Sequence, residues 1–384
     1  MDPRNATAPT RRSDPGRVLR ALLFPTLLLL AGCDESGSEI SHEDAPAGWS
    51  LVEELRIGSD EPGPELFSQI AALAVDDDGR ILVLDQQASE LRIFAADGSH
   101  EATVGGPGEG PGEFLRPFGV AVHPEDATTW VVAANRYTVF DHGGEFVTTH
   151  PRPFSYFALP WPGGFGQDGH LGDVASSTTF VRLDDGLEPV DTLAIPTVEV
   201  EQIRVTRDDG AGLMTLVRPF ASRLHWQVDG DGQLWTAESA RMHFVATTAS
   251  GDTVETRDRE HTPVPVTRAE AEEAAAGVEM AIGGFGTDVR VEGDLRAAPM
   301  KPAFQTFLVD DDGRLWVDPS MPEDAAPALE LWTAAGDWAG RIERPSGLEL
   351  GFPRPVARGP HFWAVVTDEL GVPNVVRYRI EGLP

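Results

Sequence analysis

Cysteine is almost absent from this chain of 384 residues: Cys33 is the only one, so no intrachain disulfide can form. Lysine is equally scarce, with Lys301 as its only example. Apolar runs that could cross a membrane as a helix are missing too, because the longest, residues 21–31, falls short of the ~20 residues that a span needs. These absences exclude a disulfide-stapled domain and a protein built of membrane helices.

Positive charge is also in short supply. The chain carries 30 Lys and Arg against 62 Asp and Glu, a formal net charge of −32. Residues 1–33 contain five Arg and two Asp, so the remainder carries −35. A surface this acidic repels phosphate backbones and anionic head groups. We therefore expect no nucleic-acid partner.

The first 33 residues have the features of an export signal. A basic leader precedes the apolar stretch 21–31, which has signal-peptide length. This stretch ends in Leu30-Ala31-Gly32-Cys33, which resembles the lipobox of bacterial lipoproteins, whose cysteine is diacylated and becomes the new N-terminus. The resemblance implies a signal peptide over residues 1–33 and a lipid anchor in a bacterial membrane, facing the periplasm or the cell exterior. The small, polar residues 34–50 predict a flexible tether.

Glycine, in contrast, is abundant, with 40 residues placed between short apolar runs. The glycine-rich segment 104–122 repeats the segment that begins at Ile57, 47 positions earlier. Asp-Gly turns divide the units into short strands, and Val75–Val83 nearly equals Val309–Val317. A period of this size is typical of repeat folds, whose units bury apolar faces against their neighbours. The pattern predicts an all-β chain built of four-stranded units.

A short element, most often a basic residue and a proline, precedes the first strand of each unit. These elements are Gln69-Ile70, Arg116-Pro117, Arg152-Pro153, Arg218-Pro219, Lys301-Pro302 and Arg354-Pro355. They predict a six-bladed β-propeller over residues 51–384. The last unit lacks a fourth strand, so we expect strand 51–57 to pair there and close the ring, because open sheet edges aggregate. A capping box at Thr267 and Glu270 predicts a short helical insertion between blades 4 and 5, over Ala271–Ile282, lying across one face of the propeller.

The first two units carry a family resemblance. The run Gly-Pro-Gly-Glu-Phe114, followed by Arg116-Pro117 and Gly119–Val122, is similar to six-bladed propellers of the NHL type and to related bacterial lipoproteins. The resemblance implies a propeller that binds a ligand or partner on the face where its blade-to-blade loops gather. It implies no shared enzymatic activity, because the fold hosts many functions.

Five basic residues would approach a single opening if the loops that enter the innermost strands gather at one mouth. They are Arg116, Arg152, Arg218, Lys301 and Arg354. Such a basic collar in an acidic molecule suits a carboxylate, sulfate or phosphate group. The alternative is that each of them pairs with a local acid and braces adjacent blades; for the first of them the acid would be Glu109, Glu113 or Asp85.

Motifs for catalysis are missing. The ten histidines form no His-x-His or His-Glu-x-x-His pattern, and no Gly-x-Ser-x-Gly elbow occurs. The aspartate clusters are typical of hairpin turns, so no cofactor is expected, with Ca²⁺ at Asp229-Gly-Asp231 as the alternative. The loop Gly105–Gly112 precedes a strand and not a helix, which favours turn geometry over a phosphate cradle.

Four tryptophans are expected to pack between blades, and only exposure at the mouth would let them stack on a sugar. They are Trp226, Trp235, Trp316 and Trp363. We predict a non-catalytic, monomeric binding or scaffolding lipoprotein that presents the loop-rich face of a propeller to a protein or a small anionic ligand. The alternative is a divalent-metal-dependent hydrolase or lyase, similar to propeller lactonases, with its site at the central channel and its ligands drawn singly from different inner strands.

Overall fold

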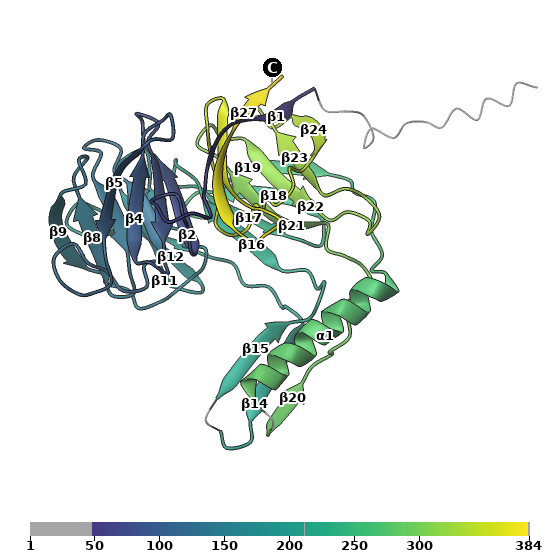
Figure 1. Ribbon diagram of the computed structural model, residues 1–384. Helices are drawn as coiled ribbons and strands as arrows, with labels where there is room; N and C mark the ends of the chain where they lie inside the picture. The colour runs from purple at the N-terminus through teal and green to yellow at the C-terminus, as the bar shows by residue number, and fades with distance from the viewer. Residues whose placement is uncertain (1–47, 211, 287, 383–384) are drawn as a thin grey trace, which may run out of the picture. The chain divides into compact units, whose positions relative to one another are not determined.

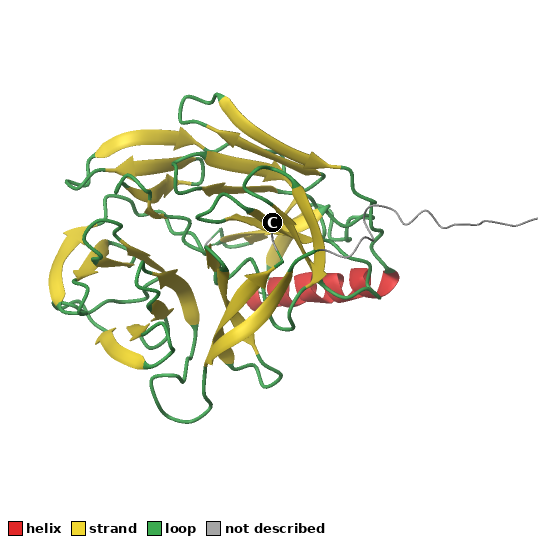
Figure 2. Ribbon diagram, turned by 90° about the horizontal axis from the view of Figure 1, so that it is seen from above, coloured by secondary structure: helices red, strands yellow, loops and turns green. Residues whose placement is uncertain are grey.

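The structure is a computed structural model that describes residues 48–210, 212–286 and 288–382. Apart from one helix, these residues form strands and loops (Figure 2). The predicted signal peptide, the lipidation site Cys33 and nearly all of the predicted tether lie outside the described residues. Within the described ranges, no helix combines the length and the apolar character that crossing a membrane requires.

Six antiparallel sheets of four strands follow one another along the chain, and we number these blades from the N-terminus. Blade 1 consists of β2 (Ile70–Val75), β3 (Ile81–Asp85), β4 (Glu90–Phe94) and β5 (His100–Gly105). Blade 2 consists of β6 (Gly119–Val122), β7 (Thr129–Val132), β8 (Arg136–Phe140) and β9 (Phe146–Pro151). Blade 3 consists of β10 (Gly164–Phe165), β11 (Leu171–Ser176), β12 (Thr179–Leu183) and β13 (Pro189–Ala194). Its first strand starts well after Arg152-Pro153, so that pair belongs to the connection that follows β9.

The remaining blades complete the ring. Blade 4 consists of β16 (Leu224–Val228), β17 (Leu234–Glu238), β18 (Met242–Thr247) and β19 (Thr253–Arg259). Blade 5 consists of β21 (Phe304–Val309), β22 (Leu315–Pro319), β23 (Ala328–Trp332) and β24 (Trp338–Glu343). Blade 6 consists of β25 (Val356–Arg358), β26 (His361–Thr367), β27 (Pro373–Glu381) and, at its edge, β1 (Ser50–Ile57). The predicted closure is confirmed, because β1 pairs antiparallel with β27, with Leu51 opposite Ile380 and Ile57 opposite Val375.

In blade 1, successive residues of the central strand β3 are apolar instead of alternating with polar residues, because neighbouring blades cover both faces of the sheet. On β3, Ile81 and Val83 pack against blade 6, whereas Leu82 and Leu84 pack against blade 2. Successive side chains of a strand point to opposite faces of the sheet, and here both faces are covered. Clusters of the same kind fill the six junctions between neighbouring blades, including that of blade 6 with blade 1. Each large side chain buried there contributes ~1.5–3 kcal/mol, so the six-bladed ring is stabilised at every junction.

The turns between first and second strands follow from their sequence. In blade 1, Asp76 Oδ1 accepts hydrogen bonds from the backbone N–H groups two and four residues later, at 3.1 and 2.8 Å. Gly79 in the same turn has a φ of +78°. Asp229 and Asp310 open equivalent turns in blades 4 and 5. The aspartate supplies the acceptor and the glycine the positive φ that the turn requires.

The glycine-rich loop after β5 folds around an aromatic ring. Phe114 is fully buried beside Gly105, where a Cβ would come within 2.3 Å of that ring. Gly105 also has a φ of +98°, which favours glycine. Further along, the backbone N–H of Gly110 donates to Glu113 Oε2 at 2.9 Å. The loop is a turn built on a core residue.

Two insertions build a small sheet with a helix on it. They contribute β14 (Gln202–Arg207) and β15 (Leu213–Val217) after blade 3, and α1 (Arg268–Phe285) and β20 (Val289–Glu292) after blade 4. The helix between blades 4 and 5 is confirmed, and so is its capping box at Thr267 and Glu270. The predicted place of the helix was wrong: α1 lies alongside the inserted sheet (Figure 1), because Val278 packs with Ile203 and Val205 of β14.

Candidate functional site

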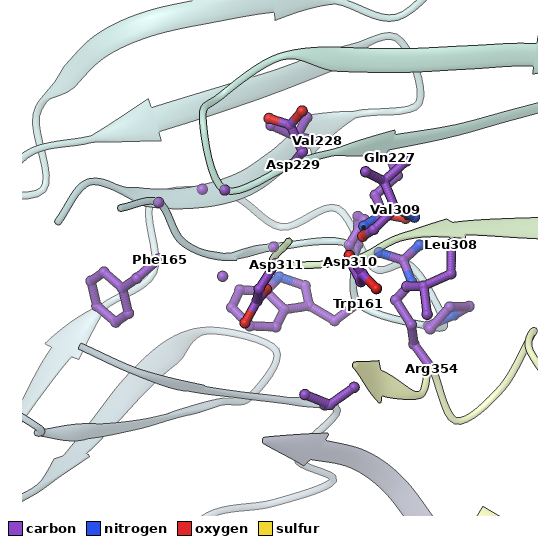
Figure 3. A pocket seen from close by; sticks show the side chains of 18 of the residues that line it. Trp161, Phe165, Gln227, Val228, Asp229, Leu308, Val309, Asp310, Asp311 and Arg354 are labelled. Carbon is purple, nitrogen blue, oxygen red and sulfur yellow. Dashed lines mark hydrogen bonds between the residues drawn. The ribbon is translucent and has the colours of Figure 1, made fainter. Parts of the chain in front are cut away.

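The first strand of every blade contributes to one central channel. Its lining includes Ala72 of β2, Val120 of β6, Phe165 of β10, Gln227 of β16, Val309 of β21 and Val356 of β25. The cavity has a volume of about 230 Å³. Figure 3 shows Trp161 and Arg354 among the side chains around this space, and both come from segments that lead into inner strands. At each end the channel widens into a mouth.

One mouth lies where the inner strands begin, and we call it the arginine mouth. It has a volume of about 680 Å³. Its charged residues are Arg223, Asp318, Arg344, Glu349 and Arg354, and its aromatic residues include Trp226, Phe307 and Phe352. Three cations face two carboxylates there, although the chain as a whole has a net charge of −32. This mouth is therefore the part of the channel that suits an anion.

The opposite mouth lies where the inner strands end, and we call it the aspartate mouth. It has a volume of about 530 Å³, and its charged residues are Asp76, Asp77, Asp78, Asp311, Asp312 and Arg358. Arg358 bridges two of these acids, pairing with Asp77 at 2.7 Å and with Asp311 at 2.8 Å. The excess of carboxylates repels anions at this end, so the channel is electrically polarised along its length.

Arg354 lines both the channel and the arginine mouth. Its guanidinium forms no hydrogen bond or ion pair with any residue in the described part of the chain. Burial lowers the pKa of Arg354 to about 10, and no acidic neighbour offsets that effect. The side chain still carries a full charge at neutral pH. Because cations withdrawn from water are ordinarily paired, Arg354 is the group in this mouth with the chemistry to pair with an anion.

Asp318 faces the same mouth from β22. Arg344 donates a hydrogen bond to Asp318 Oδ2 at 2.6 Å. Burial raises the pKa of Asp318 to about 6, with Arg344 opposing the change and Glu349 adding to it. Burial, and to a lesser degree Arg223, lowers the pKa of the nearby mouth residue His225 to about 4, so its ring is neutral at physiological pH. Several groups with displaced pKa values thus share one mouth, which is typical of functional sites.

Arg152 is held below the surface instead of lining the channel. It forms a two-bond ion pair with the buried Asp173, with Nε to Oδ2 at 2.6 Å and one terminal nitrogen to Oδ1 at 2.8 Å. Asp173 also accepts hydrogen bonds from Trp161 Nε1 at 2.8 Å and from the Tyr137 hydroxyl at 2.5 Å. Burial and the carboxylate raise the pKa of Tyr137, which keeps its proton on the donor. The network fixes the indole of Trp161 in the channel wall.

The other predicted collar residues lie apart from the channel. Lys301 donates to Glu270 at the start of α1, and Arg218 pairs with Glu201, so both hold the insertions in place. Arg116 is exposed, with a φ of +46°. Of the five predicted basic residues, only Arg354 is among those that line the channel or its mouths. The alternative considered from the sequence was pairing with a local acid, and it holds for Arg152, Arg218 and Lys301.

Two arginines of the mouth were not predicted. Arg223 directly precedes β16, whereas the predicted Arg218 lies earlier, in the connection from the insertion. Arg344-Pro345 is a further basic-proline pair, after β24, that the same search of the sequence could have found. Asp318 left no signal in the sequence, because burial alone distinguishes it from the many other aspartates.

Within residues 48–210, 212–286 and 288–382, no group of three or more His, Cys, Asp or Glu side chains is arranged to hold a metal ion. Asp229, the alternative Ca²⁺ position, directs both of its oxygens at its own hairpin. Its Oδ1 accepts hydrogen bonds from the backbone of Asp231 at 3.0 Å and of Gln233 at 2.9 Å, and its Oδ2 accepts one from Trp235 Nε1 at 2.8 Å.

A protein-family model agrees with this architecture. The family model DUF5128, described as a 6-bladed beta-propeller, matches residues 64–162, which span blades 1 and 2. No curated protein matches the sequence. A candidate exported protein from Bacteroides fragilis is similar in structure, with 12% identity and a TM-score of 0.49 over 87% of this chain and 95% of that one.

Two further solved structures are similar to a lesser extent. A virginiamycin B lyase from Staphylococcus aureus has 12% identity and a TM-score of 0.44 over 86% of this chain and 99% of that one. A member of the duf4221 family from Bacteroides vulgatus has 8% identity and a TM-score of 0.45 over 87% and 98%. Six four-stranded sheets joined in a closed ring around a channel, with a propeller model matching the first two, make this chain a six-bladed β-propeller.

Proposed function

We propose that this protein is an exported, lipid-anchored binding protein that takes a small anionic ligand at the arginine mouth of its channel. The observation that carries the proposal is that the guanidinium of Arg354, at the point where mouth and channel meet, has no partner among the described residues. Keeping a cation partly from water without a counter-ion costs free energy. An anion that accepts charge-assisted hydrogen bonds from the guanidinium offsets this cost.

The polarised channel supports one orientation of the ligand. Carboxylates dominate the aspartate mouth, where Arg358 is the only arginine or lysine among the lining residues of the described chain. The anionic end of a ligand is therefore repelled there and attracted to Arg354. The buried network around Asp173 holds Trp161 in the wall between the two mouths, which supports a preformed cavity.

The binding proposal is tested by isothermal titration calorimetry at pH 7.5 and constant ionic strength. The probes are sodium benzoate, lactate, phosphate and sulfate. Since a hydrogen bond to a charged group contributes ~1.5–3 kcal/mol, Arg354→Gln should weaken binding of the best probe by roughly 10- to 100-fold. The matched control Arg116→Gln removes an exposed arginine and should leave binding unchanged. Equal binding by Arg354→Gln, or no binding by the wild type, would contradict the proposal.

The anchor is supported by the leader and by Leu30-Ala31-Gly32-Cys33. In a bacterial host fed a labelled fatty acid, the wild-type protein should take up the label and sediment with membranes. Cys33→Ser should do neither, because the acceptor thiol is gone. Uptake of label by that variant would show that the protein is lipidated elsewhere or by another route.

A further inference from the structure

One aromatic side chain distinguishes the arginine mouth from a simple anion pocket. Trp226 of β16 is only half-buried and lines this mouth, whereas Trp235, Trp316 and Trp363 are 2%, 0% and 4% exposed. Phe180 braces its ring edge-on, with centroids 6.0 Å apart and planes at 76°. The indole Nε1 forms no hydrogen bond with the described residues and is not buried. Trp226 is therefore partly exposed at the mouth, which is the condition stated in the sequence analysis for a tryptophan that stacks on a sugar.

Hydrogen-bond acceptors without partners lie in the same mouth. Arg344 engages Asp318 only through Oδ2, which leaves Oδ1 accessible and without a donor from the described residues. Glu349 is exposed and lines the mouth. Gln305 donates through Nε2 to Ser320 Oγ at 2.7 Å, and its carbonyl oxygen receives no hydrogen bond from the described residues. The mouth therefore offers the guanidinium groups of Arg354 and of the exposed Arg223 to an anion, and several oxygen atoms that can accept hydrogen bonds from a ligand.

This mixture favours an anion that also carries hydrogen-bond donors over a bare anion. An ionised carboxylate accepts hydrogen bonds and donates none. A ligand with only a carboxylate or phosphate would satisfy Arg354 and be repelled by Asp318 and Glu349. A ligand that also carries hydroxyl groups donates to those same acceptors, and a flat apolar ring face covers an indole well.

We propose that the arginine mouth binds an acidic sugar: a pyranose ring that stacks on Trp226, places its carboxylate on Arg354 and donates hydroxyl hydrogen bonds to Asp318, Glu349 and Gln305. This proposal rests on the anion site proposed above and names its ligand class. The mouth, at about 680 Å³, lies within the ~300–1,000 Å³ of typical ligand pockets and has room for more than one sugar unit. The exposed Leu159 and the partly buried Phe352 extend the apolar lining beyond the ring.

Calorimetry with the full chain at pH 7.5 tests the ligand class. The probes are sodium D-glucuronate, D-galacturonate and tri-galacturonate, with D-glucose, benzoate and glycine as comparisons that lack the charge, the hydroxyl groups or the ring. A uronate should bind at least 10-fold more tightly than each comparison. Arg354→Gln should reduce uronate binding to the level of glucose.

The stacking contact is tested with Trp226→Leu, which should weaken uronate binding at least 10-fold. Trp130→Leu is the matched control, because Trp130 is another partly buried strand tryptophan but lines neither mouth. Trp226→Phe keeps a ring at this position, so it should bind uronate within about threefold of the wild type. The change in tryptophan fluorescence on binding should disappear in Trp226→Phe.

The outcomes separate this proposal from the more general one. If benzoate binding depends on Arg354 and no uronate binds more tightly, the proposal of an acidic sugar is wrong and the proposal of an anion site stands. If glycine binds as tightly as the uronates, the acceptor oxygens of the mouth bind an ammonium group instead of hydroxyl groups. That result would also contradict the proposal of an acidic sugar. If Trp226→Leu does not weaken uronate binding, the proposed stacking of the sugar ring on Trp226 is wrong. No binding of any probe would overturn both proposals.

Discussion

Replacing Arg354 by methionine removes the guanidinium from the channel and keeps an unbranched side chain of comparable length. Most changes of a partly buried arginine destabilise a protein because they break an ion pair, but Arg354 has no pair to lose within the described residues. Burial lowers its pKa from 12.5 to about 10. Because the folded-state pKa lies below the ordinary value, the charge destabilises the fold at neutral pH. This cost is relieved only as the pH rises above about 10.

The size of the effect follows from that lowering. At 1.36 kcal/mol per pKa unit, the change from 12.5 to about 10 corresponds to about 3 kcal/mol. Arg354 is not fully buried, so water reduces this cost, and we expect Arg354→Met to gain about 1–3 kcal/mol in the free energy of unfolding at pH 7. For roughly 335 folded residues, an unfolding entropy of ~2.1 cal/mol/K per residue converts this gain into a rise in Tm of about 1–4 °C.

Scanning calorimetry and urea unfolding at pH 7 measure the change. Arg344→Met is the matched control from the same mouth, and it should move stability in the opposite direction by about 1–3 kcal/mol, because it leaves Asp318 partly buried without its ion-pair partner. Destabilisation of Arg354→Met to the same extent as Arg344→Met would refute the reasoning, since it would mean that the guanidinium makes a stabilising contact in the free protein.

Four other outcomes are expected. Arg152→Met should cost about 3–5 kcal/mol in urea unfolding, because it leaves Asp173 buried without its counter-ion. Deleting Ser50–Ile57 bares the edge of β27, so light scattering should detect aggregates that the intact chain does not form. Thr267→Ala should lower stability by about 1 kcal/mol through loss of the helix cap, whereas Thr267→Ser should be nearly neutral. Because burial raises the pKa of Asp318 to about 6, sulfate should bind more tightly as the pH falls from 7.5 to 5, and in Asp318→Asn calorimetry should show no such trend.

The blades could be predicted because their signals are local. The aspartate and glycine of a turn such as Asp76–Gly79 satisfy that turn's own backbone, and the apolar residues beside it are buried whichever blade follows. The helix cap at Thr267 is equally local. The surface that α1 covers is not local, because its partners on β14 come from an insertion that lies one blade earlier in the chain.

The collar shows the same limit at the site. Five basic residues in similar sequence positions were expected at one opening, yet Arg152 turns to Asp173, and Lys301 to Glu270. A long basic side chain reaches several ångströms from its Cα, so its direction depends on which acid the fold brings near. A basic-proline pair in the sequence therefore does not tell where its basic side chain points.

The sequence by itself determined the number of blades, the closure of the ring by the first strand and the net negative charge, and it predicts the export signal. These depend on periodicity, turn chemistry and composition, which each segment carries within itself. Only the tertiary structure decided that the channel is polarised and that Arg354, which shares its mouth with Asp318 and Trp226, has no partner among the described residues. The reason is that charge pairing and burial depend on the distances between residues of different blades. These residues are far apart in the chain, and the distances between them are set only when the ring closes.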